Sequence, residues 1–190
     1  MEYSAPIQIL VDEHTVILSV LDSLEKVAAG DERCGGFSRE FYEKAFDFFP
    51  AFADTCHHGK EEAQLFPLLE ERGIPREGGP IGCMLVEHDD GRAHVKAVKK
   101  ALPKAAQGDR AAQETVRSEA LAFASLLRNH IFKENNILFT MADRVLSAQD
   151  KELLEKKFNC SHHSPLPPGA HEKYEALGHE LGAWLTECAA

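Results

Sequence analysis

The sequence predicts an all-α protein built as a helical bundle. Apolar residues recur every three or four positions through most of the 190-residue chain, which is the spacing of one helix face. No segment shows the strict apolar–polar alternation of a half-buried strand. Stretches rich in glycine and proline separate the periodic segments and mark the loops. Together these observations indicate helices that bury their apolar faces against one another.

The first predicted helix begins after Ala5-Pro6 and ends near Ala29-Gly30, because glycine commonly follows the last helical residue. A loop over 31–36 follows. One histidine interrupts the apolar stripe of this helix, which consists of Ile7, Leu10, Val11, His14, Leu18, Leu21 and Leu24.

The second predicted helix has Ser38 as its cap and ends near Gly73. Because an interior proline removes a backbone hydrogen bond, we expect a bend or a break near Pro50, with Pro67 as a second candidate position. The predicted inward face consists of Phe41, Ala45, Phe49, Ala53, His57, Glu61, Leu65 and Leu68.

A third helix is predicted from about Pro80 to about Ala106, and a turn at Gly108-Asp109 separates it from a fourth. The inward residues of the third helix are Ile81, Met84, Leu85, His88, Val95, Val98 and Leu102. The stripe of the fourth is Val116, Ala120, Phe123, Leu127, His130, Glu134, Ile137 and Met141. Each of the long helices therefore carries a histidine on its apolar face.

Two further segments complete the predicted organisation. A short helix covers about 147–158, and an amphipathic helix over about 171–185 follows a proline-rich linker at 164–169. We therefore divide the chain into a four-helix bundle over 1–146 and a C-terminal helical extension over 147–190 that packs on the bundle.

We interpret the histidines of the C-terminal extension as surface or loop residues. His171 and His179 can share a face of the terminal helix, but the neighbouring sequence offers them no carboxylate partner, so we interpret them as surface residues. The segment from Cys160 to His163 has the residue types of an outer metal or redox site, and a polar loop is the preferred reading.

Composition narrows the classes of partner and compartment. A formal net charge of −10 gives no electrostatic reason to bind nucleic acid or an anionic membrane. No apolar run approaches the roughly 18 residues of a membrane span, and the first residues do not resemble a signal peptide. The five cysteines form no CxxC pair, so we read them as free thiols in a reducing cytoplasm.

A weak internal repeat carries the chemistry. The segments 57–66 and 130–139 share the pattern H-x-x-K-E-x-x-x-L-F. The other two long helices each carry a Glu-His pair, Glu13-His14 and Glu87-His88. The helices thus read EH, HxxKE, EH, HxxKE.

This repeat predicts a metal site inside the bundle. Residues four apart lie on one helix face, and buried histidine and glutamate are unfavourable unless they are paired or bind a metal. One HxxxE pair alone is usually a surface ion pair, but the joint pattern on four apolar stripes is not explained that way. The predicted metal ligands are His14, His57, Glu61, His88, His130 and Glu134.

The ligand types favour iron. Nitrogen and carboxylate ligands without thiolate suit non-heme iron or manganese better than structural zinc. Manganese or a mixed metal pair remains open, because affinity order and metal supply decide occupancy as much as ligand type does.

The register in the second helix has one alternative. His58 and Glu62 form a further HxxxE pair, displaced by one residue. Aligning the two repeat units through their Leu-Phe pairs favours His57 and Glu61. His58 and Glu62 are then outer partners or an extra ligand.

The pattern resembles the hemerythrin HHE cation-binding family, whose members present H…HxxxE…H…HxxxE and often E-E-x-x-L-F-P, here Glu61 to Pro67. The resemblance covers about Ile7 to Arg144. It implies an antiparallel up-and-down four-helix bundle around two iron ions per chain, bridged by an oxo or hydroxo group. It further implies that Glu61 and Glu134 bridge the irons and that the four stripe histidines are terminal ligands.

One departure bears on function. Oxygen-carrying hemerythrins have a histidine four residues after the third-helix ligand, where this chain has Arg92, and an aspartate where it has Glu134. Fewer protein ligands leave open positions at which small molecules can react. This argues against a pure oxygen carrier and towards the subgroup linked to iron-centre repair, to nitric oxide or peroxide response, and to iron or oxygen sensing.

The leading hypothesis is a non-heme di-iron protein that binds or reacts with dioxygen, nitric oxide or peroxide in sensing, storage or stress response. The alternatives are an iron donor that repairs iron-containing centres through a protein partner, and a peroxidase-like di-iron enzyme. The sequence does not separate an enzyme from a sensor.

Overall fold

The computed structural model describes residues 3–30, 36–159 and 166–184, and this part of the chain contains helices and no strand. The first helix is α1 (Ala5–Ala28). The next helical segment comprises α2 (Arg39–Phe48), η2 (Phe49–His58), η3 (Glu61–Leu65) and α3 (Phe66–Glu71), where η denotes a π-helical segment. It is followed by α4 (Pro80–Ala105), α5 (Arg110–Lys133), η4 (Glu134–Leu138), α6 (Phe139–Val145), α7 (Ala148–Phe158) and α8 (Ala170–Gly182).

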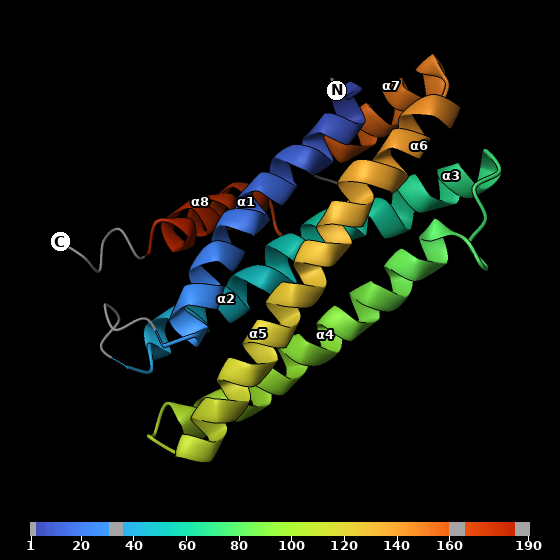
Figure 1. Ribbon diagram of the computed structural model, residues 1–190. Coiled ribbons are helices and arrows are strands. Elements are labelled where there is room, and N and C mark those ends of the chain that lie inside the picture. The colour runs from blue at the N-terminus through green and yellow to red at the C-terminus, as the bar shows by residue number, and fades with distance from the viewer. Residues whose placement is uncertain (1–2, 31–35, 160–165, 185–190) are drawn as a thin grey trace.

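The helices lie along a common direction as a bundle, which confirms the predicted all-helical fold (Figure 1). α5 packs against α4 and α1, and α8 packs along α1. The loop between α4 and α5 lies at one end of the bundle, and α3, α6 and α7 lie at the other (Figure 1). None of the described helices is long and apolar enough to cross a membrane.

Two apolar clusters fill the interior on either side of the predicted site. On α1 one cluster ends at Leu10 and the other begins at Val16, and His14 lies between them. The cluster that begins at Val16 includes Leu24, Phe41, Phe46, Phe49, Val98 and Phe123. The cluster that ends at Leu10 on α1 includes Ile7, Leu10, Leu65, Phe66, Met84, Leu138 and Phe139. The site therefore lies part-way along the bundle, flanked by close-packed apolar side chains.

The expected interruption of the second helix takes the form of a change in helix type. The backbone stays helical past Pro50, which lies at the start of η2, and past Pro67, which lies in the first turn of α3. Proline has no N–H to donate, so a shift to the wider π-helical pattern is a way to continue the helix without its α-helical hydrogen bond.

The π-helical segments also shift the inward face beyond each predicted ligand. After Glu134 the buried residues are Leu138, Phe139 and Ala142, whereas the predicted Ile137 is half exposed. The expectation for Ile137 was wrong because it assumed a continuous α-helix, and η4 rotates the residues that follow it.

The C-terminal part of the described chain contains the two expected helices. α7 begins with a capping box between Ser147 and Asp150, which satisfies the first backbone donors. α8 packs closely on α1, since a Cβ atom at Gly182 would lie 2.6 Å from Oγ of Ser19. The segment from Cys160 to His163 lies outside the described residues.

Candidate metal centre

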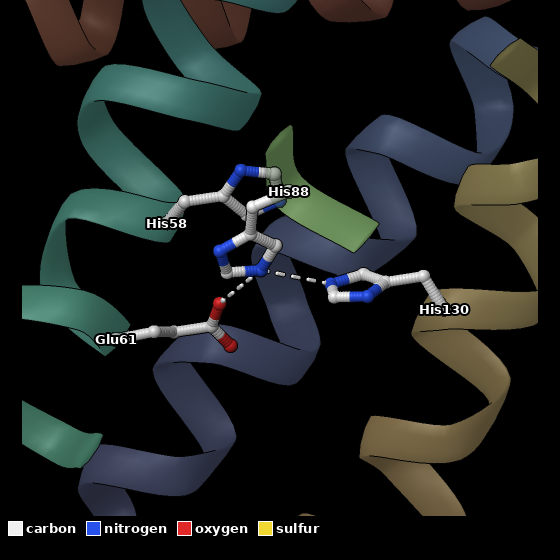
Figure 2. A group of neighbouring side chains, drawn as sticks. All are labelled: His58, Glu61, His88 and His130. Atoms are coloured by element: carbon white, nitrogen blue, oxygen red, sulfur yellow. Dashed lines mark hydrogen bonds and ion pairs between the residues drawn. The ribbon is translucent and has the colours of Figure 1, made fainter. Parts of the chain in front are cut away.

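The six predicted ligands come together inside the bundle, and a seventh side chain joins them. All are buried. One group consists of His14, His57, Glu61 and Glu134, and the other of His58, Glu61, His88 and His130 (Figure 2). The potential ligand atoms in each group lie within 4.8 Å of one another. We call these groups the first and the second metal position.

The two carboxylates each reach both positions. Glu61 has one oxygen 3.6 Å from Nε2 of His57 and the other 3.5 Å from Nε2 of His88. One oxygen of Glu134 lies 3.2 Å from Nε2 of His14 and 3.2 Å from Nε2 of His130. Side chains placed in this way can each contact two cations at once.

The Glu-His pairs explain the internal repeat. On α1, Glu13 accepts a hydrogen bond from Nδ1 of His57 at 3.0 Å and contacts the ammonium of Lys60. On α4, Glu87 accepts in the same way from Nδ1 of His130 at 3.0 Å and contacts Lys133. The glutamate of each EH pair thus orients the histidine of an HxxKE unit, and the lysine of that unit balances its charge.

The other histidines are also held from behind. Nδ1 of His14 donates to the side-chain oxygen of Asn135 at 2.8 Å, and Nδ1 of His88 donates to Glu62 at 2.7 Å. Asn135 and Glu62 occupy the same place in the two repeat units, one residue after the shared carboxylate. Partners of this kind fix the tautomer and ring orientation of metal-binding histidines.

His58 is the residue whose role the sequence left open. Its ring stacks on that of His88 with 3.7 Å between centroids, and its Nδ1 lies 3.4 Å from Asp54. Since Nδ1 faces a carboxylate, Nε2 remains for the interior. The structure therefore places His58 among the candidate ligands, and Glu62 behind one.

The arrangement fits cations. At this site seven buried polar atoms have no hydrogen-bond partner within the described residues, namely both carboxylate oxygens of Glu61 and of Glu134 and Nε2 of His14, His57 and His58. Such atoms are rare in native proteins and cost about 1–3 kcal/mol each. Nε2 of His88 and Nε2 of His130 also face each other at 3.1 Å, and a proton or cation is needed between two such lone pairs. Bound cations would satisfy all these atoms.

The protonation of the metal-free site follows from burial and charge. Burial, and then the charge of Glu134, raise the pKa of Glu61 well above its usual value. Burial lowers the pKa of His57 to about 4. Burial opposes a charged His130, but Glu134 and Glu87 outweigh it and raise the pKa of His130 to about 9. The carboxylates thus attract positive charge, which metal ions would supply in place of protons.

A largely apolar hollow reaches the second position. Together with its mouth it encloses about 440 Å³, and its wall includes His58, His88 and His130. Arg92 also lines it and bonds to both Asp54 and Glu62. The residue at the fourth position after His88 therefore ties together the partners of two candidate ligands.

Sequence reasoning left out several residues around the site, Asn135 and Asp54 among them. It left His58 open and gave Glu13 and Glu87 no role, although the repeated EH pairs contained a signal for both. The side chain of His171 is 41% exposed, as expected for a surface residue, but the expectation that it has no carboxylate partner was wrong, since its Nε2 lies 2.9 Å from Glu13. The carboxylate partner comes from α1, far away in the sequence, so the local pattern held no signal.

Comparison with known proteins agrees with this geometry. The model of the family described as hemerythrin HHE cation binding domain matches residues 5–142. The chain belongs to this family. The match spans α1 to α6 and includes all the side chains of both metal positions. No solved structure matches the chain.

One relative is named for iron chemistry. The chain is 34% identical over 92 residues to a protein of Dickeya chrysanthemi (strain Ech1591) named iron-sulfur cluster repair protein YtfE. The matched region covers 47% of this chain and 42% of that relative. The similarity therefore spans less than half of the relative's length.

Proposed function

We propose that this hemerythrin-family chain is a non-heme di-iron protein that binds or reacts with small oxidants. His14 and His57 would ligate the first iron, His88, His130 and His58 the second, and Glu61 and Glu134 both. The observation that carries the proposal is the set of buried imidazoles whose Nδ1 atoms are held from behind while their Nε2 atoms meet carboxylate oxygens that lack hydrogen-bond partners.

Iron bound here supplies electrons through its ferrous and ferric states. The surrounding residues balance its charge, orient its ligands and control the access of water and small molecules. Glu61 and Glu134 offset positive charge at both positions, and Glu13 and Glu87 keep the ligand rings in place. The two apolar clusters keep water sparse. The hollow at His58, His88 and His130 gives a small uncharged molecule such as dioxygen, nitric oxide or peroxide a route to the second position.

Metal analysis of freshly purified protein, together with its visible and near-ultraviolet spectrum, tests the proposal first. We expect about two irons per chain and absorption bands from the centre. Manganese or a mixed pair in the same stoichiometry would keep the site and change the metal. A chain without bound metal, even after ferrous loading, would contradict the proposal.

A second candidate function is the donation of iron for the repair of iron–sulfur centres through a protein partner. It is supported by the name of the Dickeya relative, an iron-sulfur cluster repair protein. Mixing the iron-loaded protein with an apo iron–sulfur protein and following cluster absorbance tests it. Fast transfer compared with free ferrous ion at equal concentration favours this function.

Stopped-flow mixing of the reduced protein with dioxygen, nitric oxide or hydrogen peroxide separates the oxidant-related roles. A stable reversible adduct favours sensing or storage. Repeated turnover of peroxide favours a peroxidase-like enzyme. Neither reaction, combined with fast iron transfer, favours the donor.

We also infer the finer architecture as an antiparallel up-and-down four-helix bundle over 1–146 with an extension over 147–190. The loops before and after α4 lie at opposite ends of the bundle, which supports it (Figure 1). The proposed cytoplasmic location rests on the odd set of cysteines without a CxxC pair.

A further inference from the structure

The carboxylate of Glu13 is the meeting point of three donors. It is buried, next to the candidate ligand His14 on α1. One oxygen accepts from Nδ1 of His57 at 3.0 Å. The other contacts Lys60 and accepts from Nε2 of His171 at 2.9 Å. His171 belongs to α8, so the C-terminal extension reaches the metal centre through one carboxylate.

Within 36–159 and 166–184, no residue of the extension forms a hydrogen bond with Glu87, the corresponding glutamate of the second half of the bundle. Glu87 accepts from His130 and Lys133, and its remaining described contact is the thiol of Cys83, whose sulfur lies 3.7 Å away. The side chain of Glu87 is 16% exposed, against 6% for Glu13. The contribution of α8 is therefore specific to the first metal position.

The position of α8 is set by close packing. A Cβ atom at Gly178 would lie 2.5 Å from a methyl group of Val16 and 2.8 Å from the ring of Phe48. The ring of His171 packs on Phe52 with 5.3 Å between centroids. A helix held this closely at its far end presents His171 to Glu13 in one register.

We propose that His171 is a positioning residue through which docking of α8 fixes Glu13, and thereby the ring of His57, at the first metal position. This inference rests on the proposed metal site. Without His171, one oxygen of Glu13 keeps only the flexible Lys60, so the carboxylate can rotate and the His57 ring loses a fixed acceptor. Because coupling between two sites is reciprocal, metal bound at His57 must strengthen the docking of α8 by the same factor.

The test compares variants loaded with ferrous iron. His171→Ala removes the donor, and His171→Gln keeps an N–H near the place of Nε2. His179→Ala, at an exposed site on the same helix, is the matched control. We expect His171→Ala to lose one of the two irons to a chelator about tenfold faster than wild type, as is typical when a partner behind a ligand is removed. His171→Gln and His179→Ala should stay within about twofold of wild type.

Amide hydrogen exchange over 170–182 gives a second readout that a purely structural role would not move. Iron loading should slow exchange there in wild type and in His179→Ala, and much less in His171→Ala. Equal iron loss from wild type and His171→Ala, or equal lability of the Ala and Gln variants, would overturn the inference alone. If wild type takes up no iron, the proposed function fails and the inference falls with it.

Discussion

The two halves of the molecule repeat one scaffold and yet build two unlike metal positions. In each half the glutamate of an EH pair holds the histidine of an HxxKE unit. At the first position the partner of His14 is the neutral Asn135. At the second, the corresponding partner of His88 is the carboxylate of Glu62, and His58 adds a further imidazole.

This difference indicates a division of labour. Carboxylate partners make histidine ligands more basic, so the second position is better suited to stabilise ferric iron. It is also the position that the hollow reaches. At the first position α8 contacts the orienting Glu13 through His171. We expect small molecules to react at the second position, while the first mainly holds the pair together.

The largest effect is expected from removing a carboxylate that contacts both metal positions. Glu134→Ala should abolish nearly all metal-dependent absorption, because one oxygen of Glu134 meets ligands of both positions. His130→Ala should remove most of the absorption by emptying the second position. Iron content and the near-ultraviolet spectrum measure both. Two tightly held irons in Glu134→Ala would show that the positions do not share this carboxylate.

The next largest effect is expected from replacing the glutamate that orients a histidine of only one metal position. Glu87→Gln should weaken iron binding at the second position by about 10- to 100-fold, since the amide is a poorer acceptor for Nδ1 of His130. Competition with a chelator measures it. Glu119→Gln, which changes a partner of the remote His94, is the control and should leave iron affinity unchanged. The idea fails if both variants bind iron equally well.

Blocking the hollow sharpens the claim about access. A Cβ atom at Gly91 would lie 3.6 Å from the ring of Phe123, so Gly91→Ala fits, while Gly91→Leu extends into the hollow. We expect Gly91→Leu to slow nitric oxide binding about tenfold without loss of iron. Stopped-flow absorbance measures the rate. An unchanged rate in the Leu variant would mean that ligands enter elsewhere.

A smaller effect concerns acid stability of the metal-free protein. Burial opposes ionisation of Asp54, but hydrogen bonds with His58 and Arg92 lower its pKa to about 2. Hydrogen bonds with His88, and then with Arg92, lower the pKa of Glu62 to about 2. Depressed pKa values stabilise the fold above the unfolded values near 4 and lose that effect as the pH falls towards 2.

Arg92→Met should bring both pKa values back towards their unfolded values. The acid-unfolding midpoint, followed by circular dichroism, should then move to higher pH by a fraction of a unit. A midpoint at the wild-type pH would assign the low pKa values to the histidines alone.

The smallest effect is expected at α7, away from both metal positions, and serves as a reference for the variants above. Ser147→Ala removes the cap of α7 and should lower the free energy of unfolding by about 1 kcal/mol. Denaturant unfolding of the metal-free protein measures the loss. Iron content should not change, and a change would mean that α7 also influences the metal centre.

Much of this site could be predicted because its histidines interrupt apolar stripes. Period and spacing alone selected His14, His57, His88 and His130, which the structure brings together. The repeat contained Glu13 and Glu87, but which histidine each of them holds could not be predicted, because local patterns do not say which helices are neighbours. Glu13 and His57 are 44 residues apart, and Glu13 and His171 are 158 apart.

The register errors have a different cause. A strict α-helical period placed Ile137 inward and left His58 undecided. His58 is the last residue of the π-helical segment η2, and Ile137 lies in the π-helical segment η4. A single wider turn rotates the following side chains by roughly 100° relative to an unbroken α-helix. Pro50 predicted an interruption where η2 begins, whereas the residue types of η4 give no signal for such a turn.

The π-helical segments η3 and η4 each begin at a shared carboxylate and impose a rule on chain length. In both, the buried residues lie four, five and eight places after the glutamate, as Leu65, Phe66 and Leu69 do after Glu61. Since a wider turn holds about one residue more than an α-helical turn, deleting the exposed Ala63 would restore the narrower winding and keep both Glu61 and the Leu-Phe pair facing inward. A homologue one residue shorter between these points can therefore keep both the ligand and the apolar end of its helix in place by forming an unbroken α-helix, and an alignment should allow a gap of one residue there.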